Sequence, residues 1–306
     1  MRCNPATGAC ETKTCGNGRC DADENPQNCP NDCKVEYVKP AIEANKNYPL
    51  ILLHGHSFAQ GQINTGSLLT WKEFQDRLSS DNFYVNQGTI LPTQSIYDFE
   101  EGTWGRLDKP VSIITTYYSG QFTPAGFTMG EDEKSIDEYA ERLAKVIDIV
   151  LRATGKAKVD IVAHSMGGLV ARTYLLTHGT SKVNKLILVG TPNQGIYDED
   201  YLGLGAFGCS LYHPGIECTQ MVHGSNFMNW LNQKETLSPS QYMTIIGNST
   251  SASTAGAYWD GVVRAQSVFI PNAQNVIMNG NGNIHTLLPK PSYFPQAYQK
   301  IVGFLK

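Results

Sequence analysis

Hydrophobic residues along most of the chain form short runs that alternate with segments of helical spacing. Short apolar or β-branched runs are typical of strands that a sheet buries on both faces. Such runs occur at residues 50–53, 159–162, 185–189, 242–246 and 275–278. Helix-compatible segments lie between Ser135 and Gly155, at residues 169–176 and at residues 295–305. Strands that alternate with helices predict an α/β fold with a mostly parallel sheet.

The segment that follows Ser135 shows the clearest helix signals. Ser135 and Glu138 have the spacing of a capping box, which marks the first turn of a helix. Gly155 is a typical helix-ending residue. Apolar residues repeat between these two ends at helical spacing, at Ile136, Leu143, Val146, Ile147 and Val150. This stripe predicts a helix that packs on the sheet with its apolar side.

A serine stands where one of the predicted strands turns into a helix. The β-branched run 159–162 ends in Ala163-His164-Ser165-Met166-Gly167, and a helix-compatible stretch follows. Strand, tight turn and helix form the context of a nucleophile elbow, in which the serine has a strained backbone and an exposed Oγ. The small residues Ala163 and Gly167 allow strand and helix to approach closely. The usual first residue is glycine, and alanine stands here as a variant. The alternative is an ordinary strand–helix turn that contains a serine.

A serine nucleophile needs a base and an acid, which follow it in the order acid, then histidine, in a fold of this type. His285 fits the base, because it follows the last strand-like run and a turn cluster at residues 279–283. Asp260 follows the penultimate strand, from which a carboxylate can reach a histidine on the next loop. Asp200, at the start of a long excursion, is the alternative acid.

Acyl transfer also needs hydrogen-bond donors for the developing oxyanion. The buried strand 50–53 runs into His54-Gly55-His56, where Gly55 lets the backbone turn. We expect the backbone N–H groups of His56 and Met166 to be these donors. The side chains of His54 and His56 either brace the loop or line an acyl pocket.

Several segments together resemble a secreted bacterial triacylglycerol lipase or carboxylesterase of the α/β-hydrolase superfamily. They are residues 54–56, 163–168, 190–195, 221–228, 260–263 and 285–288, and the likeness spans about residues 48 to 306. The resemblance implies an α/β-hydrolase fold, with helices on both faces of the sheet, and hydrolysis of carboxylic esters, often long-chain acylglycerols. It gives Ser165, Asp260 and His285 the catalytic roles. Some relatives bind a structural calcium or zinc ion, but no matching ligands can be placed here.

Composition agrees with one large domain and an appendage. The chain has 306 residues, 41% of them hydrophobic and 17% charged, with a net charge of −4 and a pI near 6.0. This charge balance argues against nucleic acid or anionic membranes as primary partners. No apolar run reaches the roughly 18 residues of a membrane span. The first residues lack the apolar region of a signal peptide, so we expect that a leader was removed and Met1 was supplied for expression.

Cysteines are concentrated at the beginning of the chain. Six lie in the first 33 residues and two follow far downstream: Cys3, Cys10, Cys15, Cys20, Cys29, Cys33, Cys209 and Cys218. An even, clustered set predicts disulfides and an oxidising, extracellular compartment. Zinc is the alternative, but the cluster has no histidine and no paired Cys-x-x-Cys spacing. We therefore expect a disulfide-stapled mini-domain at residues 1–36 and the hydrolase domain at residues 37–306.

The mini-domain also contains closely spaced oxygen ligands. Asp21, Asp23, Asn25 and Asp32 stand at positions 1, 3, 5 and 12 of a calcium-loop pattern, although Pro26 occupies the glycine position. A structural calcium ion is therefore a hypothesis, and the alternative is a polar, turn-rich surface. The predicted chemistry itself requires no cofactor.

A long excursion at residues 196–230 is rich in large apolar residues. Loops of this length are usually functional or carry helices of their own. We interpret the excursion as a lid over an acyl-binding cleft that opens at an oil–water interface, with an inert insertion as the alternative.

The whole sequence is compatible with three functions: a lipase, the same chemistry on a polyester or phospholipid, or a non-catalytic binding protein. The presence of Ser165, Asp260 and His285 together argues against the third.

Overall fold

The computed structural model describes residues 2–3, 10–11, 48–56, 66–123, 126–130, 134–197, 215–233, 241–249 and 259–306. The chain divides into two compact units, Met1–Ala44 and Asn45–Lys306. In the first unit, strands β1 (Arg2–Cys3) and β2 (Cys10–Glu11) pair antiparallel, with Cys3 opposite Cys10. The predicted boundary near residue 36 lies outside the described residues. So do four of the six cysteines of the first unit and the calcium candidates: Cys15, Cys20, Cys29, Cys33, Asp21, Asp23, Asn25 and Asp32.

The second unit is built on a seven-stranded sheet in the order β11-β10-β9-β8-β3-β5-β4, in which every neighbouring pair is parallel. The strands are β3 (Leu50–Leu53), β4 (Val85–Ile90), β5 (Val111–Thr115), β8 (Val159–His164), β9 (Val183–Val189), β10 (Tyr242–Ser249) and β11 (Gln274–Gly280). An antiparallel hairpin of β6 (Ser119–Thr123) and β7 (Gly126–Gly130) follows β5. This arrangement confirms the predicted parallel sheet.

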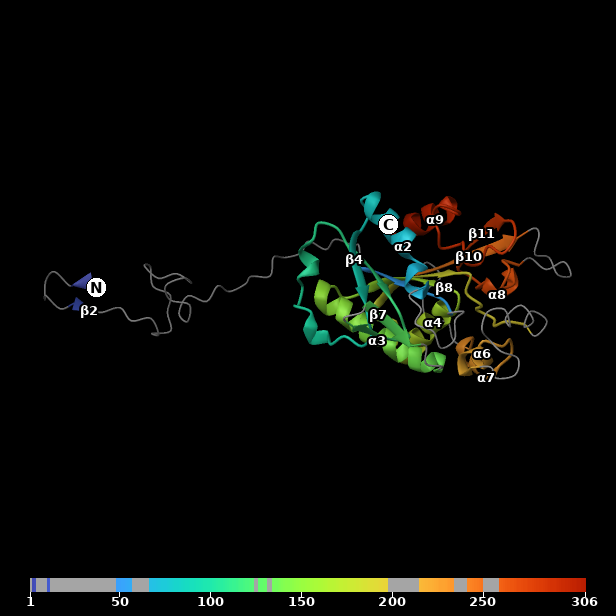
Figure 1. Ribbon diagram of the computed structural model, residues 1–306, viewed down its shortest axis with the longest axis horizontal. Coiled ribbons are helices and arrows are strands. Elements are labelled where there is room, and N and C mark those ends of the chain that lie inside the picture. The colour runs from blue at the N-terminus through green and yellow to red at the C-terminus, as the bar shows by residue number, and fades with distance from the viewer. Residues whose placement is uncertain are drawn as a thin grey trace. The chain divides into compact units, whose positions relative to one another are not determined.

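Helices cover both faces of the sheet (Figure 1). The helices in the described residues are α1 (Gly66–Leu69), α2 (Lys72–Ser80), α3 (Ile136–Thr154), α4 (Met166–His178), α6 (Ile216–Gln220), α7 (Asn226–Leu231), α8 (Ala265–Val268) and α9 (Pro295–Leu305). Two short 3₁₀ turns, η1 (Ile96–Asp98) and η2 (Trp104–Arg106), precede β5. The predicted fold class, a parallel sheet between two layers of helices, is thus confirmed.

Alternation along the strands creates two separate cores. Ile51 and Leu53 of β3 join the cluster under α3 and α4, whereas Leu50 and Leu52 join the cluster under α2 and α9. Successive strand residues point to opposite faces, so a strand buried on both faces must be apolar throughout. All four of these residues are fully buried. The uninterrupted apolar runs of the sequence therefore result from burial between two helical layers.

The helix ends predicted from Ser135, Gly155 and residues 295–305 are present in the structure. The Ser135 side chain accepts a hydrogen bond from the Glu138 N–H and begins α3, and Gly155 ends it in the left-handed conformation, at φ 64°. Helix α9 has the predicted bounds, with Pro295 in its first turn. Local capping chemistry satisfies backbone groups at helix ends whatever the surrounding fold, which is why these ends can be read from sequence.

The described part of the long excursion packs partly against the core. Ile196 and Val222 form a parallel bridge, so residue 222 lies beside the first residue of the excursion. Met228 of α7 is buried in the cluster under α4, although the sequence places it among exposed-looking apolar residues. Ile216 of α6 and Trp230 of α7 remain exposed. The rest of the predicted lid, residues 198–214 with Cys209 among them, lies outside the described residues.

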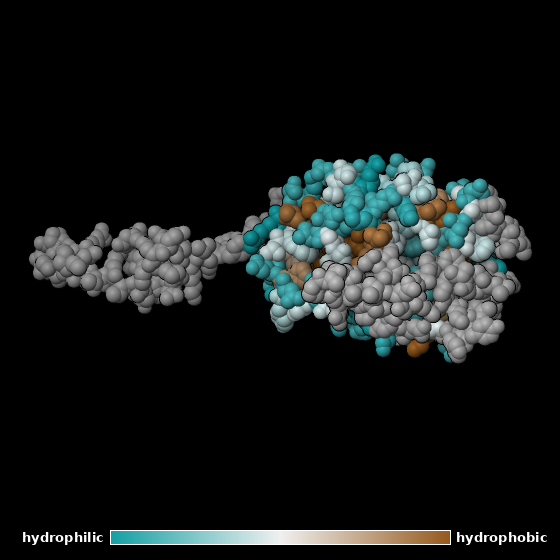
Figure 2. Space-filling view, viewed as in Figure 1, coloured by the Kyte–Doolittle hydropathy of each residue, from teal (hydrophilic) through white to brown (hydrophobic). Residues whose placement is uncertain are grey.

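Within the described ranges, no helix has the length and apolar character needed to cross a membrane. On the face shown in Figure 2, hydrophilic side chains cover most of the described surface and hydrophobic ones form small, separate patches. The exposed large apolar residues come from different elements: Leu69, Tyr97, Leu107, Ile216, Trp230, Phe269, Ile277 and Tyr293. Isolated apolar residues of this kind are ordinary on protein surfaces.

Candidate active site

Ser165 lies on a sharp turn between β8 and α4. Its backbone has φ 51° and ψ −130°, outside the left-handed helical region. The other described non-glycine residues with positive φ are Asn82 and Asn272, a residue type that tolerates it. Such a conformation costs roughly 1–3 kcal/mol, which the surrounding structure must supply. The predicted strain at the serine is therefore present.

Glycines make room for this turn. A Cβ on Gly167 would lie 2.1 Å from the carbonyl oxygen of His54, and one on Gly168 would lie 2.1 Å from Oγ1 of Thr191. Both distances are far below any van der Waals contact. The first turn of α4 therefore packs directly on the backbone that follows β3, and this contact holds the serine above the sheet.

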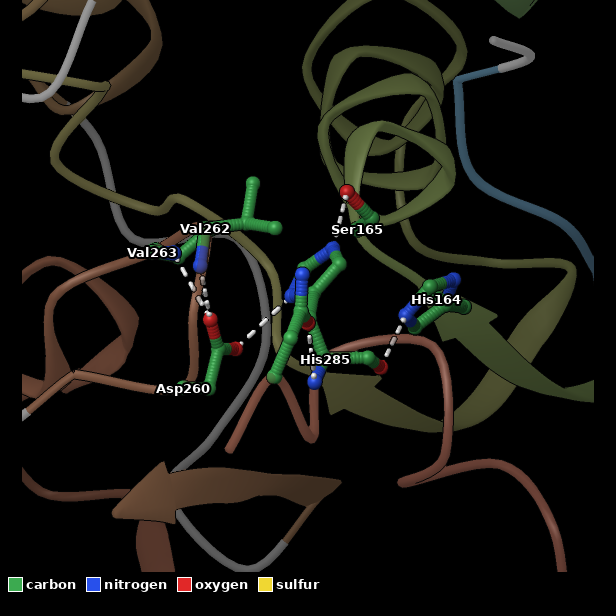
Figure 3. A network of polar contacts seen from close by, with 7 residues as sticks. His164, Ser165, Asp260, Val262, Val263 and His285 are labelled. Atoms are coloured by element: carbon green, nitrogen blue, oxygen red, sulfur yellow. Dashed lines mark hydrogen bonds and ion pairs between the residues drawn. The ribbon is translucent and has the colours of Figure 1, made fainter. Parts of the chain in front are cut away.

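Three side chains from the carboxyl ends of three strands meet at this turn (Figure 3). Nε2 of His285, which follows β11, is 3.0 Å from Oγ of Ser165. Nδ1 of His285 is 2.7 Å from Oδ2 of Asp260, which follows β10. The structure thus brings the predicted nucleophile, base and acid into one chain of hydrogen bonds. Asp200, the alternative acid, lies outside the described residues.

The carboxylate of Asp260 is buried, and both of its oxygens accept hydrogen bonds. Its Oδ1 accepts hydrogen bonds from the backbone N–H groups of Val262 and Val263, at 2.9 and 2.7 Å. Its Oδ2 faces His285, so Nδ1 of the imidazole is the donor in that pair. Nε2 of a neutral His285 then carries a lone pair and can accept the Ser165 proton. The environment of Asp260 therefore selects the tautomer that a general base requires.

His164, next to the nucleophile, holds the backbone of the base. Its Nε2 lies 3.0 Å from the carbonyl oxygen of His285 (Figure 3), and the two rings are 4.7 Å apart. A carbonyl only accepts, so Nε2 of His164 carries the proton. Burial, and then the neighbouring His285, lower the pKa of His164 well below its ordinary value and keep it neutral.

The predicted oxyanion loop lies directly beside the serine. A Cβ on Gly55 would be 2.8 Å from Cβ of Ser165, so only glycine fits there. Burial lowers the pKa of His54 to about 4, and its ring is hydrogen-bonded to Gly55 and to Thr116. Of the two roles left open for the His54 side chain, these contacts match loop bracing. Met166, the other predicted donor, is the first residue of α4, where backbone N–H groups have no partner within the helix.

One cluster among the described residues brings potential metal ligands together. Ligand atoms of His56, Glu217 and Cys218 lie within 4.8 Å of one another. Cys218 is disulfide-bonded, so its sulfur cannot act as the thiolate that metals bind. Two remaining side chains are fewer than the three or four protein ligands of typical zinc sites. These residues therefore do not fit a metal centre.

Sequence reasoning missed three residues around the site. Thr116 and Tyr117 follow β5: Oγ1 of Thr116 is hydrogen-bonded to the His54 ring, and Oη of Tyr117 donates to the Gly55 carbonyl. His164 reaches the carbonyl oxygen of His285. The only available signal for the first two was their position directly after an apolar strand, since residues at the carboxyl ends of parallel strands gather at one edge.

Comparison with known proteins agrees with this architecture. Residues 104–207 match a family described as the alpha/beta hydrolase fold. The mature lipase BlEst2 of Bacillus licheniformis is 16% identical, with a TM-score of 0.52 over 84% of this chain and 92% of that one. A gene product of Listeria innocua is 17% identical, with a TM-score of 0.53 over 85% and 94%.

A third solved structure has a similar fold within a longer chain. Phospholipase PlaB of Legionella pneumophila is 14% identical, with a TM-score of 0.55 over 84% of this chain and 58% of that one. The parallel sheet, the strained serine between β8 and α4, and these matches lead to the same conclusion. The chain has the α/β-hydrolase fold.

Proposed function

We propose that this protein is a serine hydrolase that cleaves carboxylic esters. One observation carries the proposal: the continuous hydrogen bonding from Ser165 Oγ through His285 to a buried Asp260, at 3.0 and 2.7 Å. A protein that only bound ligands would have no need for a strained serine in contact with a histidine that a buried aspartate orients. The binding-protein alternative is therefore disfavoured.

The geometry supports a two-step reaction. Ser165 Oγ attacks the ester carbonyl while its proton moves to His285 Nε2, and the N–H groups of His56 and Met166 stabilise the oxyanion. His285 then protonates the leaving alcohol, and an acyl-enzyme remains on Ser165. Water, deprotonated by His285, releases the acid and restores the serine. Asp260 stabilises the imidazolium in both steps. No step requires a metal or an organic cofactor.

Acylglycerols are the proposed substrates. The resemblance to lipases in the sequence and the fold shared with a solved lipase support this assignment. A phospholipid is the second candidate, because PlaB is a phospholipase of similar fold. The predicted lid at residues 196–230 suits substrates at an oil–water interface. The cysteine-rich beginning of the chain supports an extracellular, oxidising compartment.

The substitution Ser165→Ala tests the chemistry. We expect turnover of p-nitrophenyl butyrate to fall by roughly three orders of magnitude or more. Ser292→Ala, at an exposed serine hydrogen-bonded to Glu73, should retain parental turnover. Retention of near-parental turnover by Ser165→Ala would refute the assignment of the nucleophile.

Substrate class is tested with the parental protein. Initial rates are compared on p-nitrophenyl esters of increasing chain length, emulsified triolein, phosphatidylcholine vesicles and a polyester film. The fastest hydrolysis, relative to the amount of accessible ester, should be of triolein. Faster hydrolysis of phosphatidylcholine or of the film would agree with the proposed mechanism but would show that the substrate is a phospholipid or a polyester.

A further inference from the structure

The carbonyl group of Gly55 is held by two short hydrogen bonds inside the protein. Oη of Tyr117 donates to it at 2.6 Å, and Nδ1 of His54 lies at the same distance of 2.6 Å. A carbonyl oxygen has two lone pairs, so these two donors saturate it. Tyr117 and His54 are both fully buried, and their rings are 4.3 Å apart. Tyr117 follows β5 and Gly55 follows β3, so pairing of these two strands brings them together.

The hydrogen bonds around this carbonyl have one consistent direction. Because the carbonyl can only accept, His54 carries its proton on Nδ1, and its Nε2 accepts from Oγ1 of Thr116 at 2.8 Å. Oγ1 of Thr116 in turn accepts the backbone N–H of Tyr118 at 3.0 Å. Burial lowers the pKa of His54 and raises the pKa of Tyr117, so the first stays neutral and the second keeps its proton. Every donor in this series of hydrogen bonds therefore has an acceptor.

This arrangement fixes the orientation of a neighbouring N–H group. The peptide between Gly55 and His56 is planar and trans, so its C=O and N–H point to opposite edges of one plane. Two hydrogen bonds on the oxygen therefore also set the direction of the His56 N–H. Glycine would otherwise allow this plane to rotate more freely than any other residue. The same glycine lies against Ser165, with 2.8 Å between its ideal Cβ position and Cβ of the serine.

We propose that Tyr117 is a positioning residue of the oxyanion site: its hydroxyl, with His54, holds the Gly55 carbonyl so that the His56 N–H points at the oxyanion formed on attack by Ser165. This inference rests on the proposed ester hydrolysis. Tyr117 touches neither the substrate nor Ser165 in this role. It acts through the peptide plane, and its contribution is greatest when negative charge develops on the substrate oxygen.

Tyr117→Phe tests the proposal with a readout that a purely structural role would not change. Loss of a whole oxyanion donor costs about 10²–10³ in kcat, and loss of one of two restraints on that donor should cost less. We expect kcat for p-nitrophenyl butyrate to fall about tenfold while KM stays within about twofold. Affinity for an alkyl trifluoromethyl ketone, which forms a tetrahedral oxyanion adduct on the serine, should fall by the same factor as kcat. Affinity for the matching methyl ketone should not change.

Tyr139→Phe is the matched control. Tyr139 is buried in the same aromatic cluster, with its ring 4.9 Å from that of Tyr117, but its hydroxyl accepts the backbone N–H of Lys134. It should keep parental kcat and ketone affinities. Thr116→Val is a second test for the case that Tyr117→Phe does not fold. It should lower kcat and trifluoromethyl ketone affinity together, by about twofold to fivefold, because it frees the far side of the His54 ring.

Each outcome decides the proposal. Parental kcat and trifluoromethyl ketone affinity in Tyr117→Phe would overturn it, and so would an equal loss of affinity for both ketones. If Tyr117→Phe does not fold, parental kcat in Thr116→Val would overturn it. Failure of the parental protein to hydrolyse any ester would instead refute the proposed function, which separates the two results.

Discussion

The substitution Asp260→Asn should trap His285 in the wrong tautomer. In the parental protein, Oδ1 of Asp260 accepts two backbone N–H groups, from Val262 and Val263. An asparagine must place its only oxygen at this position, because an amide NH₂ there would face two donors at 2.7–2.9 Å. Its NH₂ group then faces Nδ1 of His285. Two donors cannot share that contact, so His285 moves its proton to Nε2.

A proton on Nε2 abolishes the base. Nε2 is the atom 3.0 Å from Ser165 Oγ, and once protonated it cannot accept the serine proton. In serine proteases the same change of tautomer lowers kcat about 10⁴-fold, and we expect a loss of about 10³–10⁴ here. At about 1.4 kcal/mol per factor of ten, this corresponds to roughly 4–5.5 kcal/mol of transition-state stabilisation. The fold should persist, since both backbone hydrogen bonds keep an acceptor.

The assay compares kcat on p-nitrophenyl butyrate at neutral pH with thermal unfolding followed by circular dichroism. Asp200→Asn is the matched control, because Asp200 is the alternative acid of the sequence. A loss below about tenfold in Asp260→Asn would refute the tautomer argument. If Asp200→Asn lost most of its activity instead, Asp200 in the excursion would be the catalytic acid. A variant that no longer unfolds cooperatively would show that Asp260 acts mainly in stability.

Three further predictions concern stability and covalent structure. Burial raises the pKa of Asp160 from 3.8 to about 7, so the folded protein holds this proton to higher pH than the unfolded chain, and stability is lost as pH rises from about 4 to about 7. Asp160→Asn should therefore stabilise the protein at pH 8 by several kcal/mol, since each pKa unit corresponds to about 1.4 kcal/mol, and should not stabilise it at pH 4. An equal difference in Tm between variant and parent at both pH values would contradict this. Gly167→Ala, whose Cβ would meet a backbone oxygen at 2.1 Å, should fold poorly or unfold at a much lower temperature; Gly303→Ala on α9, where nothing lies within 4 Å, should be neutral or slightly stabilising, and similar Tm values for the two would refute the packing argument. Thiol titration of the unreduced, denatured protein should find essentially none of the eight cysteines free, and several reactive thiols would overturn the disulfide interpretation.

Much of the fold could be predicted because its signals are local. Apolar runs marked strands of the central sheet, since a strand covered on both faces has no polar side. Ser135 and Gly155 marked the ends of α3 through hydrogen bonds within a few residues. The element ends were less accurate elsewhere: β8 continues to His164, and α4 begins already at Met166. Sheet pairing and helix packing extend such elements beyond what the residues favour on their own.

In the candidate site, too, some features could be predicted from local sequence and others depend on strand pairing. The serine turn could be recognised from Ala163, Ser165 and Gly167, because a strained elbow needs small neighbours in adjacent positions. His285 and Asp260 could be selected from their order relative to the predicted strands. Their contact distances depend on the pairing of β11 with β10 and of β10 with β9, which no local pattern encodes.

By itself, the sequence determined the alternation of strands and helices, the serine at a strand–helix turn, and the order in which acid and histidine follow it. Only the tertiary structure decided which side chains hold this machinery in place. Tyr117 and Gly55 are 62 positions apart, and they meet because β3 pairs with β5. Met228 is buried because α7 lies against α4, although its own sequence neighbourhood resembles an exposed loop. Contacts of this kind depend on chain segments that are distant in sequence, and so they exist only once the sheet has formed.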